Sequence, residues 1–183
     1  MEKSLRMGKL SAIVSFLSGT IIFALYFLTS WAGLLLVGYV FIAITGPTNI
    51  VILVNLIRKT KSNKKHRLEF YKTCGLILLN IPVMLIYCWI ATILFGTMRI
   101  RLTNTTQTEL TSIRIIGCEP KFVEKLMPGQ SKTVWVGITG DCSIRMVYLS
   151  NGQQKEEFIA GYVTSGMGQK MQYNIGGKNE MRF

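Results

Sequence analysis

Two long stretches without a charged residue dominate the first half of the chain. The first runs from Leu10 to Ile57, and the second from Thr73 to Met98. A helix that crosses a bilayer needs about 20 predominantly apolar residues. The pattern therefore predicts three transmembrane helices, with a tight turn at Ser30-Trp31-Ala32-Gly33 between the first two. They cover residues 10–29, 33–57 and 73–97.

Residues 98–183 follow a different pattern, in which apolar and polar residues alternate with a period of two. This alternation is typical of β-strands, and turn sequences separate its segments, most clearly Asn151-Gly152. Six or seven short strands at this spacing predict an all-β antiparallel sandwich, Ig-like in strand number. The expected strands cover residues 98–103, 110–116, 122–126, 132–138, 142–149, 156–163 and 169–175, of which 122–126 has the weakest pattern.

Positive charge is concentrated beside the apolar stretches. The net charge is +12, and most of the excess lies in residues 1–9 and 58–72. Basic residues stay on the cytoplasmic side of membrane helices, so both segments are expected in the cytoplasm and the C-terminal domain outside it. That compartment is the periplasm, across the inner membrane, if the cell is Gram-negative. The basic residues of the loop are Arg58, Lys59, Lys61, Lys64, Lys65, Arg67 and Lys72.

The predicted organisation therefore has three parts. They are a cytoplasmic tail (1–9), a three-helix transmembrane region (10–97) with a basic cytoplasmic loop (58–72), and an extracytoplasmic domain (98–183). The lipid bilayer is the expected partner of the helices, and the loop is placed to contact anionic headgroups.

Two other interpretations of the charged and apolar segments are less consistent with the sequence. Ser30-Trp31-Ala32 resembles a signal-peptide cleavage site, but the apolar stretch before it is longer than a usual signal sequence. The basic stretch has only Phe70 and Tyr71 as aromatic residues at its end, whereas single-stranded nucleic acid is bound through a series of stacking aromatics. No nucleic-acid partner is expected.

Small and polar residues within the spans predict how the helices pack. Ser11, Ser15 and Gly19 recur every four residues and form a small-residue stripe. Such a stripe lets helices approach closely. It serves either packing within this chain, the simpler interpretation, or docking of another membrane protein.

The spans also contain prolines and asparagines. Pro47 and Pro82 remove helix hydrogen bonds and are expected to bend their helices. Asn49, Asn55 and Asn80 are expected to form hydrogen bonds between helices. The spans carry no Asp, Glu, Lys, Arg or His, which argues against an ion or proton transporter.

The candidate chemistry of the exported domain is sparse. Cys118 and Cys142 both lie beside expected turns, and they are candidates for a disulfide in an oxidising compartment. His66, the single histidine, lies in the basic loop, so the domain has no histidine for a catalytic triad. No cysteine spacing indicates a metal site, and nothing selects a pair of carboxylates. We expect no enzymatic activity, cofactor or metal.

Aromatic residues of the domain serve either its core, the simpler interpretation, or a binding surface. Trp135 alternates out of phase with Val134 and Val136, so it is expected on the outer face of its strand. There it would mark a partner surface or an interfacial anchor. Asn104-Thr105-Thr106 matches the glycosylation sequon, and its use is left open. The other candidate aromatics are Phe158, Tyr162 and Tyr173.

Elimination leaves a non-catalytic integral membrane protein. The first hypothesis is an accessory or scaffold subunit that binds another membrane protein. The alternative is an extracytoplasmic ligand-binding or sensing module, whose small-molecule ligand the sequence does not name. A further alternative is an immunity or protective protein that blocks a toxin.

Overall fold

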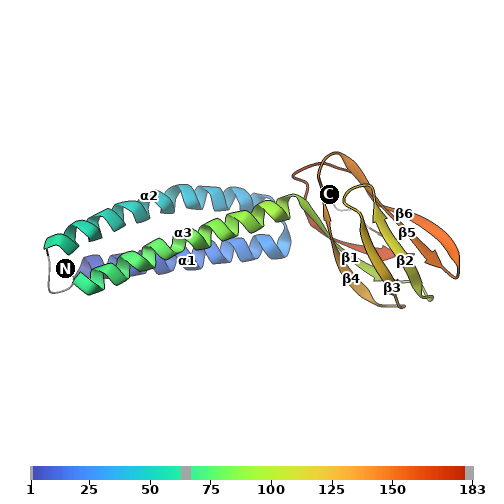
Figure 1. Cartoon of the computed structure of the whole chain (residues 1–183), viewed down its shortest axis with the longest axis horizontal. Coiled ribbons are helices and arrows are strands. Elements are labelled where there is room, and N and C mark those ends of the chain that lie inside the picture. The colour runs from blue at the N-terminus through green and yellow to red at the C-terminus, as the bar shows by residue number, and fades with distance from the viewer. Residues whose placement is uncertain (1, 63–66, 180–183) are drawn as a thin grey trace. The chain divides into compact units, whose positions relative to one another are not determined.

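The chain folds into two compact units, Met1–Ala91 and Thr92–Phe183. The structure is a computed structural model, which describes the backbone of residues 2–62 and 67–179 and the side chains of 3–59 and 67–179. The first unit is helical, and the second holds seven β-strands (Figure 1). The division falls before the end of the third helix, whose last turn belongs to the β unit.

Three helices among the described residues are long and apolar enough to cross a membrane. They are α1 (Glu2–Thr29), α2 (Gly33–Ser62) and α3 (Arg67–Phe95). This confirms the three predicted helices, and each helix extends beyond its apolar stretch at one end at least. The expected tail and much of the expected loop are helical, because lysine, arginine and leucine are good helix formers and the helices continue past the apolar stretches into these segments. Thr97, expected at the end of the third span, begins a strand instead.

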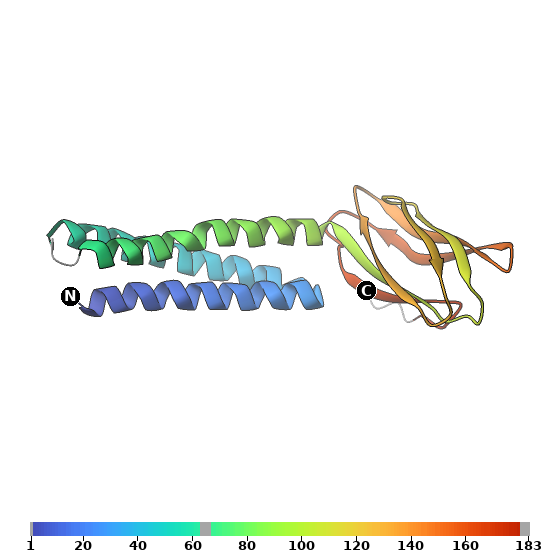
Figure 2. The ribbon, with the colours of Figure 1, turned by 60° about the horizontal axis from the view of Figure 1, so that its bottom comes forward.

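Tight packing within the helical unit is concentrated where α1 begins, α2 ends and α3 begins. A methyl group at Gly8 would lie 2.8 Å from both Leu56 Cδ1 and Thr73 Cγ2, so all three helices meet there. The helices run side by side (Figure 2), and most of their other large apolar side chains are exposed, as lipid-facing residues would be. The buried cluster consists of Leu5, Ala12, Leu56, Phe70, Cys74 and Ile77.

Both prolines lie within continuous helices. Pro47 is inside α2 and Pro82 is inside α3. Each lacks the N–H that would bond to the carbonyl four residues earlier. The bends expected at these positions stay a prediction.

The β unit contains a three-stranded sheet in the order β4-β1-β7 and a four-stranded sheet in the order β3-β2-β5-β6. All seven expected strands are present, with ends shifted by at most a few residues. Strand bounds are β1 (Thr97–Asn104), β2 (Leu110–Ile116), β3 (Lys121–Leu126), β4 (Ser131–Gly137), β5 (Cys142–Ser150), β6 (Gln153–Val163) and β7 (Lys170–Ile175).

One strand pair corrects the expectation of a purely antiparallel domain. β1 and β7 are parallel, paired from Arg99 with Lys170 to Asn104 with Ile175. The other paired strands are antiparallel. Alternation along a strand records which side chains point inward. It holds no information on the direction of the neighbouring strand, so the sequence could not predict this pair.

The two sheets bury one shared core. Ile100 and Val136 contribute from the three-stranded sheet, and Ile113, Met146 and Ile159 from the four-stranded sheet. Residues of both sheets therefore lose contact with water together, which is the main source of the domain's stability. The alternation of apolar residues predicted most of these positions.

β6 departs from the expected alternation. Strict alternation would place Phe158, Ala160 and Tyr162 on one face, but Ile159 and Ala160 are both buried, while Phe158 and Tyr162 are exposed. The pairing of β6 with β5 shifts twice, on either side of Ile144. Each shift is a β-bulge that adds a residue to one strand and changes which face its side chains occupy.

Candidate functional site

Polar side chains of the helices bond to one another inside the helical unit. Ser11 Oγ donates to Asn49 Oδ1 at 2.8 Å, and Asn49 Nδ2 donates to Ser15 Oγ at 3.1 Å. Asn80 Nδ2 donates to the Ala12 carbonyl at 3.0 Å, which links α3 to α1. The small-residue stripe thus packs against α2. The third member, Gly19, has the Phe41 ring 3.5 Å from where its Cβ would be.

We expect Asn49→Leu to lower the free energy of unfolding in detergent by about 1 kcal/mol, because hydrogen bonds between membrane helices contribute about this much. The matched control is Asn55→Leu, since Asn55 lies on the exposed face of the same helix. Thermal or SDS-induced unfolding of the purified full-length chain measures both. Equal stability of the two variants would show that the Asn49 bonds contribute nothing.

The basic residues that the structure describes lie at one end of the helical unit. Lys59 Nζ donates to Ser4 Oγ, which brings the end of α2 to the start of α1. Arg67 Nε donates to Tyr71 Oη at 3.0 Å, and its guanidinium lies 5.3 Å from the centre of the Tyr71 ring. Arg58 and Lys72 are exposed. The side chains of Lys61, Lys64 and Lys65, and all of His66, lie outside the described residues.

The end of α3 is enclosed by loops of the β unit. Gly168 N donates to the Phe95 carbonyl at 2.9 Å, and Ile138 N donates to the Gly96 carbonyl at 2.8 Å. The last carbonyls of a helix have no partner within it, and these loops supply some of the missing donors. A side chain at Gly168 would not fit, because its Cβ would lie 2.2 Å from the Leu94 carbonyl oxygen. The sequence indicated a turn here, but not this contact.

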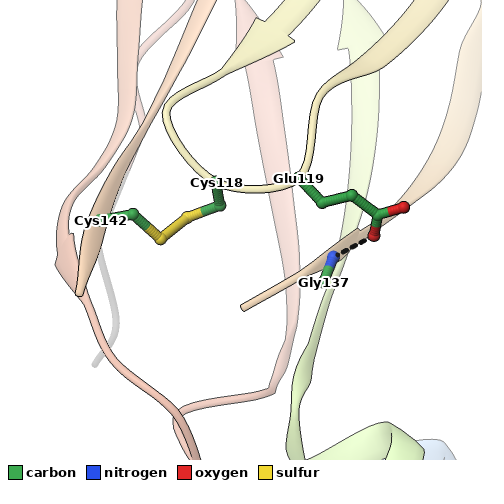
Figure 3. Close-up of a disulfide and its surroundings, with 4 residues drawn as sticks. All are labelled: Cys118, Glu119, Gly137 and Cys142. Atoms are coloured by element: carbon green, nitrogen blue, oxygen red, sulfur yellow. Dashed lines mark hydrogen bonds between the residues drawn. A yellow bond between two sulfur atoms is a disulfide. The ribbon is translucent and has the colours of Figure 1, made fainter. Parts of the chain in front are cut away.

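A disulfide joins Cys118, in the loop after β2, to Cys142 at the start of β5 (Figure 3). The Cα atoms are 5.5 Å apart, a usual spacing for a bridged pair. The bridge that the sequence left open is therefore present. Among the described residues, no three histidine, cysteine or acidic side chains gather in a way that could hold a metal ion.

Glu119 fixes the same loop to the other sheet. Its N–H donates to the Gly137 carbonyl at 3.2 Å, and Gly137 N–H donates to Glu119 Oε2 at 3.0 Å (Figure 3). Lys121 Nζ donates to Glu119 Oε1 at 2.5 Å. Lys121 and the Gly137 N–H both stabilise the carboxylate and lower the pKa of Glu119. The loop between β2 and β3 is therefore tied to β5 by a covalent bond and to β4 by hydrogen bonds.

A second polar cluster links the two sheets at β6 and β7. Tyr148 Oη and Tyr173 Oη donate to the two carboxylate oxygens of Glu157, at 2.6 and 2.8 Å. Burial, followed by the bond to Glu157, raises the pKa of both phenols. The three residues come from three strands. No local sequence pattern could have grouped them, and Tyr173 was expected only as a core or binding aromatic.

Stability of the β unit is expected to fall as the pH rises above about 10 because of these phenols. Below the unfolded pKa of about 10, both states keep the protons and the contribution is complete. Above it, the unfolded chain loses protons that the folded chain retains, so unfolding is favoured. Melting temperatures of the full-length chain between about pH 9 and pH 11 measure the effect. Tyr173→Phe should reduce the fall of the melting temperature with rising pH. Tyr162→Phe is the matched control, and an equal effect of both would contradict the assignment.

Asn104 of the glycosylation sequon is completely buried. Its Nδ2 donates to the carbonyls of Thr108 and Leu126 at 2.8 and 2.9 Å. Its Oδ1 accepts the N–H and the hydroxyl of Thr106 at 2.9 and 2.7 Å. The amide shapes the turn after β1, and in the folded domain it is inaccessible to a glycan-transferring enzyme.

The candidate aromatics separate into buried and exposed groups. Tyr173 is buried, whereas Phe158 is 64% exposed and Tyr162 is 58% exposed. Trp135 is 43% exposed and lies opposite the buried Val134 and Val136, as its phase predicted. The Arg99 guanidinium lies 5.8 Å from the centre of the Trp135 ring. The sequence did not single out Phe122, which is 61% exposed on β3.

No family model matches the chain, and no curated protein matches it. A similar solved structure is the NMR structure of a protein from Eubacterium rectale, which is 17% identical. The likeness covers 43% of this chain and 76% of that chain, with a TM-score of 0.35. A likeness at this level supports no inference about fold or function, so the function must be argued from the residues themselves.

Two regions of the β unit therefore stand out. The first is the end that encloses α3, where the disulfide and Glu119 hold the loops. The disulfide and these hydrogen bonds join residues of the domain to one another. The second is the outer surface of the sheets, where large aromatic side chains face solvent. Aromatic residues are more frequent in protein interfaces than on the rest of the surface.

Proposed function

We propose that the chain is a non-catalytic integral membrane protein that acts as an accessory or scaffold subunit of another membrane protein. The observation that carries the proposal is the exposure of Phe122, Trp135, Phe158 and Tyr162 on the β domain. Burying such side chains against a partner removes apolar surface from water, and aromatic residues are enriched in protein interfaces.

The arrangement of charge supports a topology in which the N-terminus is cytoplasmic and the β domain is exported. Lys3, Arg6 and Lys9 lie on the same end of the helical unit as Arg58 and Lys59. The opposite end of the helical unit contains the turn between α1 and α2 and the last turns of α3. It carries no charged residue, because these segments lie within the uncharged stretches Leu10–Ile57 and Thr73–Met98. The disulfide supports export as well, because such bonds persist in oxidising compartments.

The helical unit supports a role in anchoring. Ser11, Ser15, Asn49 and Asn80 form bonds within the unit, between its helices. These polar groups hold the three helices to one another and leave the partner-binding role to the exported domain. Stable anchoring and an exposed binding domain are the two properties that a scaffold subunit needs.

The β domain is proposed to be a sandwich that is Ig-like in strand number. Two sheets of three and four strands share one core, which supports this description. The strand order differs from that of an Ig constant domain, which pairs its first strand with its second. Here β1 lies between β4 and β7.

Purification of the tagged full-length chain from its native membrane in a mild detergent tests the proposal. We expect a second membrane protein to co-elute in a fixed ratio through affinity and size-exclusion steps. The control is a tagged unrelated three-helix membrane protein, which should lack this companion. A homogeneous species containing only the 20.6 kDa chain would contradict the accessory role.

A further inference from the structure

The outer face of the four-stranded sheet carries two rows of side chains that the strand pairing sets side by side. The first row crosses all four strands, and the second crosses three of them. We refer to these seven residues as the Phe/Arg face. The first row is Phe122, Arg114, Val147 and Glu156, and the second is Ile116, Arg145 and Phe158.

Two phenyl rings mark the edges of the Phe/Arg face. Phe122 is on the edge strand β3 and Phe158 is on the edge strand β6. Neighbouring strands lie about 4.8 Å apart, so the two edges are roughly 14 Å apart. Val147 and Ile116 lie between the edges and are half-buried. The face therefore offers apolar contact across its full width, with a guanidinium in each row.

The charges of the face are not balanced. Arg145 Nη1 lies 3.1 Å from Glu156 Oε1, so this pair is neutral as a whole. Arg114 is exposed and forms no ion pair with any residue that the structure describes. It is paired across strands with Phe122 on one side and Val147 on the other. Across the strands Arg114 is thus flanked by apolar side chains on both sides, and the exposed Glu124 follows two residues after Phe122 on β3.

We propose that the Phe/Arg face docks an acidic segment of a membrane-protein partner, with apolar side chains flanking its carboxylate. This inference rests on the proposed function and specifies the surface and the partner's chemistry. A carboxylate would accept the paired N–H donors of Arg114, and flanking apolar residues would cover Phe122 and Phe158. Arginine and aromatic residues dominate the binding energy of many interfaces. A basic segment would be repelled by Arg114.

The face with Trp135 is less suited to this role. Its tryptophan ring already contacts the Arg99 guanidinium of the same domain. The edge of β6 is also less suited to strand addition, because Lys155, Glu156 and Glu157 follow one another there. Charged residues on an edge strand discourage the pairing of a further strand.

Binding of defined peptides to the full-length chain in phosphatidylcholine nanodiscs tests the proposed chemistry. The probe is a short fluorescent peptide of Glu, Leu and Phe, and its control has Lys in place of Glu. We expect the acidic peptide to bind and the basic peptide to bind at least about tenfold more weakly. Arg114→Glu and Phe158→Ser should each weaken the acidic peptide about tenfold. Arg101→Glu, an exposed arginine on the other sheet, should have no such effect.

Equal binding of the two peptides, binding to empty nanodiscs alone, no binding, or equal loss in the Arg101→Glu control would overturn the inference. The substituted side chains are exposed, so the variants should fold. Unchanged melting temperature and an intact disulfide on a non-reducing gel check this.

Repeating the co-purification with Arg114→Glu separates this inference from the proposed function. Loss of the companion protein supports both. A companion that stays bound to this variant and to Phe158→Ser overturns the docking face and leaves the accessory role intact. Absence of a companion from the wild-type chain contradicts the accessory role, and the peptide experiment still decides the chemistry of the face.

Discussion

Replacing Gly117 with alanine is expected to lower the free energy of unfolding of the β domain by about 3 kcal/mol or more. Gly117 has a φ of 108°, a conformation that residues with a side chain rarely adopt. An added Cβ would lie 1.6 Å from the carbonyl oxygen of Ser143. Neither the turn nor β5 could keep its position, because the collision is between backbone and the first side-chain atom.

The position of Gly117 explains why the effect should spread. It precedes Cys118, and Ser143 follows Cys142, so the close approach lies directly beside the disulfide. Alanine would push apart the two segments that the bridge holds together. The substitution therefore acts at the point where the loop after β2 is tied to the four-stranded sheet.

Thermal unfolding of the full-length chain in detergent, followed by circular dichroism in the β region, measures the effect. Gly161→Ala is the matched control, because Gly161 lies in β6 with no neighbouring atom within 4 Å of an added Cβ. We expect a large fall in melting temperature for the first variant and little change for the second. Similar melting temperatures for both would mean that the turn tolerates a side chain.

The second large effect is expected on removal of the disulfide. Cys118 and Cys142 are 24 residues apart, and a closed loop of this length contributes about 3 kcal/mol, mainly by restricting the unfolded chain. Serine at both positions should lower the free energy of unfolding by about this amount, because both side chains are only half-buried and the core is otherwise unchanged.

Reduction supplies an independent comparison. A thiol reductant should lower the melting temperature of the wild-type chain to that of the Cys118→Ser/Cys142→Ser variant. It should leave the variant unchanged, although Cys74 and Cys88 are still present as thiols. A shift of the variant by the reductant would show that the effect does not come from this bridge. Because Gly117 and the disulfide are neighbours, the losses caused by the two changes should not add.

Local patterns predicted the elements of this fold well. Unbroken apolar stretches predicted three helices, and alternation predicted six or seven strands and the outward position of Trp135 against the buried Val134 and Val136. These features depend on which side of an element meets water or lipid, and residue polarity along the chain records that side directly. The ends of the helices were less predictable, because charged residues such as Arg58 and Lys59 continue a helix as well as they end an apolar span.

The candidate sites were only partly predictable, because most of them join residues that are distant along the chain. Cys118 and Cys142 could be paired from the sequence because they are two cysteines in one expected domain. Phe122 could not be distinguished from a core residue, since a short edge strand shows little alternation. The cluster of Tyr148, Glu157 and Tyr173 had no local pattern at all.

The sequence by itself determined that part of this chain is built for lipid and part for water, since that division is carried by the polarity of consecutive residues. Only the tertiary structure decided the parallel pairing of β1 with β7, the register shifts on β6 that accompany the burial of both Ile159 and Ala160, and the close approach at Gly117. Each of these depends on a strand distant along the chain. The direction, register and separation of two such strands are set when both sheets close over a common core, and no single segment contains them.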